Sequence, residues 1–343
     1  MENMKLHIVL FPWLAFGHMI PYLELAKSLA QMGHRISFLS TPRNIDRLLP
    51  NVPRDLQPQL HFVKLTPPAI EGLPEDAQSA NEVPSHQIPL IIKLQDGMEG
   101  PVRAFIQNNP LPDWILYDIF HYWAPAVATD YGIPSVLFTP FSAMSLCFFG
   151  PPSVLLDSTA RGESSPQQKT TPPHWIPFPT NIAWRYHDAV RAMKSLSSPD
   201  SVTGITLNHR LGKAIQGCNA AAMRSCIDLE PEWIPLLRQL WQKPVFACLL
   251  SPSVSETSST EDGETQAVLD WLDTQKPGSV VYVAFGSEWQ LNREEAHEVA
   301  FGLEQSELPF FLIEGTRIYF HPVSRSGTRP KGSSTWAGHL SRG

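Results

Sequence analysis

The chain has 343 residues, a formal net charge of −7, 43% hydrophobic residues and 17% charged residues. This length suggests about two domains, and the apolar fraction is sufficient for a packed core, which excludes a disordered chain. The net negative charge argues against a protein whose main partner is nucleic acid. None of the four cysteines belongs to a C-x-x-C pair, so we expect neither a zinc knuckle nor a thioredoxin-like site. Reduced, buried thiols in a cytoplasmic protein are the simpler interpretation.

Two apolar stretches resemble targeting or membrane segments. Residues 8–16 follow Lys5, but they contain Pro12 and Trp13, and no small-residue cleavage pattern follows them. Residues 133–156 carry no charge over 24 positions, but they contain four prolines, four serines and a threonine. A membrane-spanning helix needs about 20 mostly apolar residues. We therefore predict a buried strand, a short helix and a turn, and no transmembrane segment.

The first part of the chain alternates between short apolar runs and stretches with helical periodicity. A strand, a helix that ends at Gly33 and a second strand occur within about 40 residues, which predicts a β-α-β unit and hence a parallel sheet. Residues 151–200 are rich in Pro and Ser and are predicted to be an irregular surface excursion. We expect strands at 5–11, 35–40, 60–65, 113–118, 134–139, 219–224 and 244–249, and helices at 18–33, 87–108, 122–131, 203–216 and 231–241.

A polar stretch at 251–264 separates this part from a second α/β run and is typical of a linker or an exposed loop. Helices are expected at 265–274 and 292–305, and strands at 279–285 and 309–313. A doubly wound domain normally has five or six strands, so the second domain is predicted to be incomplete. Its strands around 280–285 and 310–313 should have an unpaired edge. The domain organisation expected is 1–243, then a partial domain at 244–314, then a tail at 315–343.

The tail differs in composition from the rest of the chain. Residues 315–343 contain five basic residues and no acidic one, and they are rich in Gly and Ser without apolar periodicity. One hypothesis is a basic, disordered tail. The other is that this stretch is not native sequence.

The loop Pro12–His18 joins the first strand to the first helix, where an open parallel sheet binds ligands. Gly17 would allow a tight turn. His18 would lie at the helix N-terminus, where the helix dipole disfavours a positive imidazole, and a neutral ring suits a general base. The alternative is a histidine that only caps the helix.

Asp118 ends the predicted strand 113–118, also at a carboxyl end. Its carboxylate could accept a hydrogen bond from His18 and fix the ring tautomer. It could equally cap the helix that follows. His121 lies three residues further on and is a second possible base, although its place in a first helical turn favours a structural role.

A third possible site follows the strand 279–285. The sequence Phe285-Gly286-Ser287 precedes a predicted helix, and a strand, a glycine turn and a helix N-terminus can bind a phosphate. One Gly-Ser pair is a weak signal, and an ordinary turn is the alternative.

The run PWLAFGHMIPYLELAKSLAQMGH (Pro12–His34) resembles the start of the plant family 1 UDP-sugar-dependent glycosyltransferases. STPRNIDRL (40–48), DWILYD (113–118), RSCIDLEPEW (224–233) and SVVYVAFGSE (279–288) follow in the order of that family. The similarity extends from about Lys5 to Leu312. PWLAFGH and STPRNIDRL are most similar to the branch that adds a sugar to a flavonoid or triterpenoid glycoside.

The resemblance implies a GT-B fold, with an N-terminal Rossmann-like domain for the acceptor and a C-terminal one for the nucleotide sugar. His18 would be the catalytic base and Asp118 its partner; Gly17 would lie beside the sugar and phosphates, and Ser287 near the donor diphosphate. The reaction implied is inverting transfer from a UDP-sugar, with no metal and no cofactor beyond the UDP-sugar co-substrate. We also expect a monomer that acts on a small hydrophobic glycoside.

One part of the family pattern is missing from this sequence. The family's donor box runs from a tryptophan that stacks on uracil to an Asp-Gln pair for the sugar hydroxyls, and no such stretch follows FFLIEG (310–315). Neither Trp336 nor His339 has the required context. The alternative function is therefore a truncated, catalytically inactive variant that binds an acceptor-like molecule or has no activity.

Overall fold

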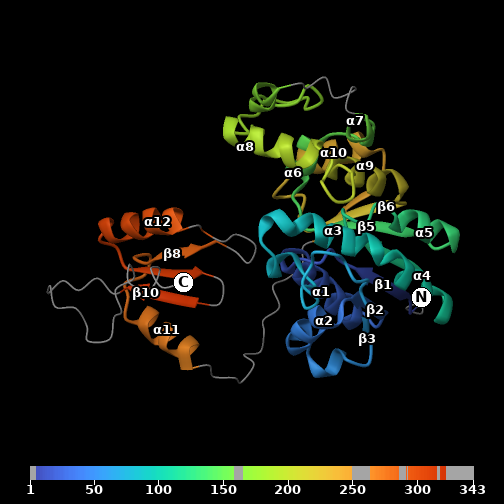
Figure 1. Cartoon of the computed structure of the whole chain (residues 1–343), viewed down its shortest axis with the longest axis horizontal. Coiled ribbons are helices and arrows are strands. Elements are labelled where there is room, and N and C mark those ends of the chain that lie inside the picture. The colour runs from blue at the N-terminus through green and yellow to red at the C-terminus, as the bar shows by residue number, and fades with distance from the viewer. Residues whose placement is uncertain are drawn as a thin grey trace. The chain divides into compact units, whose positions relative to one another are not determined.

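The computed structural model describes residues 5–157, 165–248, 263–285, 291, 293–314 and 317–321 (Figure 1). The chain forms two compact units, Met1–Ser253 and Val254–Gly343. The predicted strand at 244–249 belongs to the first of them, so that unit extends beyond the expected boundary at residue 243.

The first unit is built on a parallel seven-stranded sheet in the order β3-β2-β1-β4-β5-β6-β7. The strand order reverses between β1 and β4. Leu10 of β1 lies opposite Phe38 of β2 on one side and opposite Leu116 of β4 on the other. In an open parallel sheet this reversal opens a crevice at the carboxyl ends of the two central strands. The strands are β1 (His7–Phe11), β2 (Arg35–Ser40), β3 (Leu60–Lys64), β4 (Trp114–Tyr117), β5 (Ser135–Thr139), β6 (Ala220–Met223) and β7 (Val245–Ala247).

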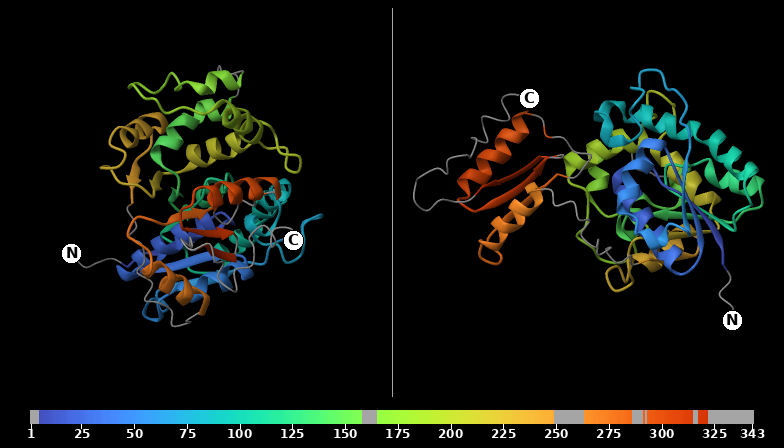
Figure 2. Two further views of the ribbon diagram at one scale, coloured as in Figure 1. Left: turned by 90° about the vertical axis from the view of Figure 1, so that its left-hand side faces the viewer. Right: turned by 90° about the horizontal axis from the view of Figure 1, so that it is seen from below.

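Helices cover both faces of this sheet (Figure 2), and their bounds follow the predicted alternation. They are α1 (Phe16–Gln31), α2 (Pro42–Leu48), α3 (Ile88–Gly97), α4 (Glu99–Asn108), α5 (Ala124–Asp130), α6 (Ala143–Phe149), α7 (Pro152–Leu156), α8 (Tyr186–Ala192), α9 (Leu207–Gly217) and α10 (Trp233–Trp241). Gly33 follows α1 with φ +89°, the left-handed conformation that glycine adopts at a helix end.

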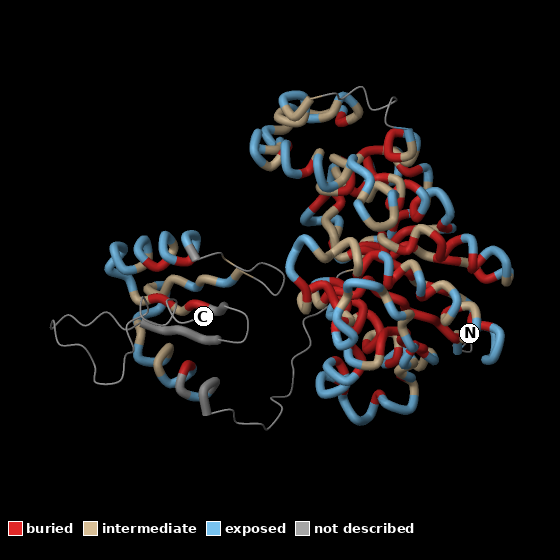
Figure 3. The backbone as a smooth tube through the Cα atoms, viewed as in Figure 1, coloured by how far each residue is buried: buried red, intermediate tan, exposed pale blue. Residues whose placement is uncertain are grey.

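Side chains of each strand alternate between two apolar cores because a strand has a period of two residues. On β1, Ile8 and Leu10 pack with α1 on one face, whereas Val9 and Phe11 belong to the larger core on the other face. Buried residues fill the interior of this unit (Figure 3). A sheet covered on both faces explains why its strands read as continuous apolar runs.

Two predictions for the first unit need correction. The single helix expected at 87–108 is two helices, α3 and α4, divided at Met98. Pro101 lacks an N–H group and its ring clashes with the carbonyl four residues earlier, so an unbroken helix is disfavoured there. The segment 151–200 is also less irregular than expected, because it contains α7 and α8. Val154 and Leu155 of α7 are buried, which gives that short helix its packing partners.

The second unit contains α11 (Gly263–Asp273), β8 (Val281–Ala284), α12 (Arg293–Gln305), β9 (Phe310–Glu314) and β10 (Arg317–His321). Its sheet has three strands, with β9 in the centre, parallel to β8 and antiparallel to β10. The prediction of a structureless tail from residue 315 is therefore wrong for β10. The expected unpaired edge at 310–313 is also wrong, because β10 supplies β9 with a second hydrogen-bonded neighbour.

Candidate active site

The strand reversal between β1 and β4 brings together two residues that lie 100 positions apart in the sequence. His18 lies in the first turn of α1, directly after the loop that follows β1, and Asp118 directly follows β4. The His18 Nδ1 atom is 2.8 Å from the Asp118 Oδ2 atom, and both side chains are buried. The structure thus confirms the geometry that the sequence could only suggest for this pair.

The surroundings of Asp118 fix its role as a hydrogen-bond acceptor. The backbone N–H of Trp13 donates to Oδ2 at 3.2 Å, and the backbone N–H of Ile119 donates to Oδ1 at 2.7 Å. Since an ionised carboxylate can only accept, the proton in the contact with His18 belongs to Nδ1. The neutral ring then has its lone pair on Nε2, the tautomer that a general base requires.

Two aromatic rings lie beside the His18 imidazole. The ring of Phe141 meets it edge-on, with centroids 5.5 Å apart and planes at 84°, and the ring of Phe120 lies at 6.1 Å and 61°. Phe120 follows β4 and Phe141 follows β5, so both come from carboxyl ends of the sheet. The His18 imidazole therefore lies in an apolar environment, in which its hydrogen bond to Asp118 is stronger than in water.

His121, the other possible base, has a structural environment. Its side chain is fully buried, contacts the Gln95 side chain and lies within hydrogen-bond distance of the Asp118 backbone. Its ring also packs on Phe11 and Trp123. Burial lowers the pKa of His121 to about 4, so the ring is neutral at physiological pH. These contacts agree with the structural interpretation that its sequence position favoured.

The structure describes one of the other two predicted site residues, Gly17, which directly precedes His18. Gly17 is exposed and is the second residue of α1, so it lies in the helix and not in the tight turn expected of it. Ser287 lies outside the described residues. The sequence reasoning did not identify Phe141. The signal available for it was its position just beyond the end of a predicted strand, where ligand-contacting side chains gather.

A cavity of about 500 Å³ occurs elsewhere in the first unit, and His18 and Asp118 do not line it. Its walls come from α7, from the segment around Met193 to Thr206 and from the start of α9. The His18–Asp118 pair at the carboxyl ends of β1 and β4 is therefore separate from this cavity.

The described residues provide neither a metal-binding cluster nor a membrane span. No group of three or more His, Cys, Asp or Glu side chains is placed to hold a metal ion in that part of the chain. Among the helices of the described ranges, none has the length and apolar character needed to cross a bilayer.

Comparison with known proteins gives consistent relatives, although no protein-family model matches the chain. It is 41% identical to UDP-glycosyltransferase 91C1 of Arabidopsis thaliana over 308 residues, which cover 90% of this chain and 65% of that protein. It is 36% identical to the soyasaponin III rhamnosyltransferase of Glycine max over 314 residues, again 90% of this chain and 65% of the relative. The chain thus spans about 65% of the length of the curated relatives it matches.

Solved structures share the fold at lower sequence identity. UGT73P12 of Glycyrrhiza uralensis, solved in complex with glycyrrhetinic acid 3-O-monoglucuronide, superposes with a TM-score of 0.71 at 21% identity. The match covers 91% of this chain and 63% of that one. The expected GT-B fold class is confirmed by this likeness together with the parallel sheet of the first unit.

Proposed function

Because the chain belongs to the plant UDP-glycosyltransferase family, we propose that it acts in the transfer of a sugar from a UDP-sugar to a hydroxyl group of a small plant glycoside. The observation that carries the proposal is the buried contact between His18 and Asp118 at the carboxyl ends of β1 and β4. A neutral histidine whose orientation is fixed by a carboxylate is suited to general-base catalysis.

The proposed reaction follows from the ring tautomer. His18 Nε2 removes the proton from the acceptor hydroxyl, and the oxygen attacks the anomeric carbon on the face opposite the UDP group. The new C–O bond forms as the bond to the diphosphate breaks, and UDP leaves with the bonding electrons. Asp118 stabilises the imidazolium that results. A single in-line displacement of this kind inverts the anomeric configuration, and it needs no metal or other cofactor.

The acceptor proposed is a hydrophobic glycoside of the flavonoid or triterpenoid class. The soybean relative is named for a saponin acceptor, and saponins are glycosides with an apolar aglycone. Phe120 and Phe141 offer apolar surface beside the base, which suits such an aglycone. The second unit is the proposed contributor to UDP-sugar binding, with Ser287 near the diphosphate and Gly17 near the sugar.

A second candidate function is acceptor binding without transfer. It is favoured by one observation: in the described part of the chain, the His18–Asp118 pair and the two phenylalanine rings beside it all belong to the first unit, which the family resemblance assigns to the acceptor. In-line positioning of two reactants can contribute roughly 7–11 kcal/mol to catalysis. A chain that positions only the acceptor would therefore bind it and turn over slowly or not at all.

The two functions are separated by assaying the 343-residue chain beside a chimera. In the chimera, the part of the Arabidopsis relative beyond the matched region follows Glu314. Both are incubated with UDP-glucose or UDP-rhamnose and a panel of flavonoid and triterpenoid glycosides, and products are identified by chromatography and by the anomeric coupling constant. We expect an inverted product from the chimera and little from the 343-residue chain.

Calorimetric titration with the same glycosides completes the test. Heat of acceptor binding without product in either protein would favour the second function. Neither product nor heat with any donor and acceptor would contradict both proposals.

A further inference from the structure

We propose that Glu230 is a positioning residue that holds Phe141 against His18 and so keeps water away from the catalytic pair. The inference deepens the proposed function, because it concerns the environment of the same base. Glu230 is not near His18 in the sequence, and it acts through α6, which begins two residues after Phe141.

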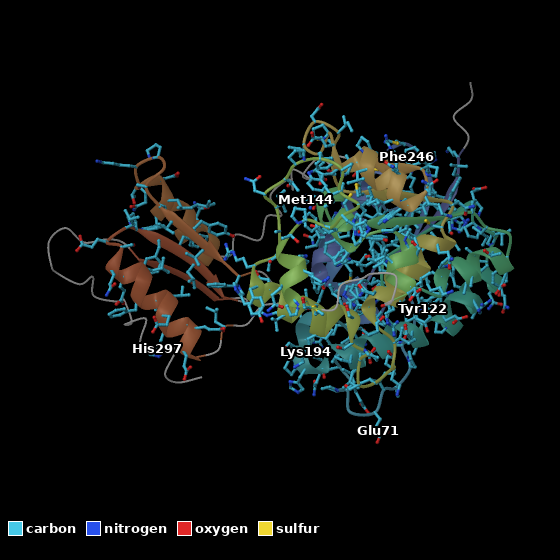
Figure 4. The ribbon with its side chains drawn as sticks, turned by 90° about the horizontal axis from the view of Figure 1, so that it is seen from above. Glu71, Tyr122, Met144, Lys194, Phe246 and His297 are labelled. Atoms are coloured by element: carbon cyan, nitrogen blue, oxygen red, sulfur yellow. The ribbon has the colours of Figure 1, made fainter. Side chains whose placement is uncertain are left out.

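Glu230 binds the N-terminus of α6 with both carboxylate oxygens. The backbone N–H of Ala143 donates to Oε2 at 3.0 Å, and that of Met144 donates to Oε1 at 2.8 Å. The Ser225 hydroxyl also contacts Oε2. Glu230 itself is 9% exposed and lies between β6 and α10, whereas Met144, labelled in Figure 4, is on α6. The carboxylate therefore links two segments that are 86 residues apart.

This contact satisfies backbone groups that the helix cannot satisfy itself. The first N–H groups of a helix have no intrahelical partner, and a negative charge near them is favoured by the helix dipole. Ser142 caps only the N–H of Ser145, at 3.2 Å, and leaves the N–H groups of Ala143 and Met144 to Glu230. Without the carboxylate, the buried start of α6 would have to move or be hydrated.

Phe141 lies between this anchor and the end of β5. Its backbone N–H donates to Thr139 Oγ1 at 3.2 Å on the side of the strand, while Glu230 holds the residues on the side of α6. Its ring is the nearer of the two phenylalanine rings to the His18 imidazole, at 5.5 Å against 6.1 Å for Phe120. A shift of α6 would therefore displace the ring that meets the His18 imidazole edge-on.

If Glu230 only capped α6, a different result would be expected. Removing its carboxylate would lower the stability of the protein but would leave the exchange rate of the His18 proton unchanged. The discriminating measurement is the rate at which the His18 Nδ1 proton exchanges with water in the 343-residue protein. This proton is observed by NMR and assigned by its loss in His18→Ala.

We expect Glu230→Gln to speed this exchange about fivefold, the effect of losing about one net hydrogen bond from the closed state. Glu232→Gln is the matched control, because Glu232 is an exposed glutamate two residues away and should leave the rate unchanged. Ser225→Ala, a milder change that removes one hydrogen bond to Glu230, should speed exchange by a smaller factor. It keeps the test available if Glu230→Gln does not fold.

A double-variant comparison tests the route through Phe141. Phe141→Ala alone should speed the exchange, and adding Glu230→Gln to it should change the rate less than about twofold, because the ring is already absent. The inference is overturned if Glu230→Gln lowers Tm without changing the exchange rate, or if its full effect persists beside Phe141→Ala. The assay needs no sugar transfer, so failure of the proposed function would not be mistaken for failure of this inference.

Discussion

The two units share the alternation of strands and helices but differ in how much of it they bury. In the first unit every residue of β1 is buried, and helices cover both faces of the sheet. In the second unit, Tyr282 of β8 is 64% exposed and Phe301 of α12 is 61% exposed, although Phe310 and Leu312 of β9 are buried. A pattern of α/β elements therefore predicts the class of fold, but it does not predict how far each element is buried.

The two units also differ in whether their strand order reverses, which bears on the position of the candidate site. A ligand crevice forms where the strand order reverses, and the seven-stranded sheet reverses between β1 and β4. The three-stranded order β10-β9-β8 follows the chain without such a point. Among the described residues, the histidine–carboxylate pair accordingly occurs in the first unit.

The largest expected effect separates the two units physically. Residues 1–253 alone should fold with a cooperative thermal transition within a few degrees of that of the whole chain, because both apolar cores of the first unit lie inside that range. Residues 254–343 alone should show no cooperative transition. Both are measured by circular dichroism and calorimetry. A stable 254–343 fragment, or an unfolded 1–253 fragment, would contradict the expectation that the first unit folds by itself and the second does not.

A smaller effect is expected from the buried ion pair of the first unit. Arg210 is fully buried, and its guanidinium binds Asp96 through two contacts of 2.6 and 2.7 Å. Asp96→Ala removes the carboxylate that binds this buried cation through two contacts and should lower the free energy of unfolding by about 3–5 kcal/mol. The control is Asp130→Ala, because Asp130 is 57% exposed and its pairing with Arg103 should contribute less than about 1 kcal/mol.

Chemical denaturation of the 1–253 fragment measures both variants. Equal losses of unfolding free energy for Asp96→Ala and Asp130→Ala would show that water reaches Arg210. The first unit would then be less well packed around Arg210 than its burial indicates.

The smallest effect, counted per pH unit, comes from protonation of His121. Burial lowers the pKa of His121 from its ordinary value of 6.5 to about 4. As pH falls below 6.5 the unfolded chain binds a proton at this residue, whereas the folded protein does not until about pH 4. The free energy of unfolding should therefore fall by up to about 1.4 kcal/mol per pH unit between these values on account of His121. Burial also lowers the pKa values of His7 and His209, so they act in the same direction.

The variant His121→Gln isolates the contribution of this residue. It should flatten the decline of Tm between pH 6.5 and pH 4 relative to the unmodified protein, and it should make little difference to the slope between pH 7 and pH 8. A wild-type slope that His121→Gln leaves unchanged would mean that the ring is accessible to protons in the folded state.

Much of the first unit could be predicted because its signals are local. The strand Arg35–Ser40 was predicted with its observed bounds, and the stop after α1 follows from Gly33, which has the conformation that glycine adopts most readily. The split between α3 and α4 also had a local cause in Pro101, although the periodicity of the surrounding residues concealed it. The strand β10 and its pairing with β9 were not predicted, although Ile318–Phe320 is a short apolar run, because the basic, Gly- and Ser-rich composition of residues 315–343 concealed it.

The candidate site depends on contacts between residues far apart in the sequence, and no local sequence pattern predicts such contacts. His18 and Asp118 could each be selected because each follows a strand, but their 2.8 Å contact requires that β1 and β4 be neighbours. Phe141 and Glu230 were not predicted, because their relation to His18 depends on α6 binding a segment 86 residues away. For Gly17, the expectation of a tight turn was wrong because α1 begins one residue earlier than the glycine.

The central claim is that His18 and Asp118 act as one unit that removes the acceptor proton. The most direct measurement is a double-mutant cycle on kcat in the chimera, with His18→Ala, Asp118→Asn and both together. General-base catalysis contributes typically 10²–10⁴-fold, and residues that act as a unit are not additive. We predict a loss in that range for His18→Ala, acceptor binding within about threefold of the unmodified chimera, and no further loss when Asp118→Asn is added. Losses that multiply in the double variant, or an unchanged kcat in His18→Ala, would contradict the account.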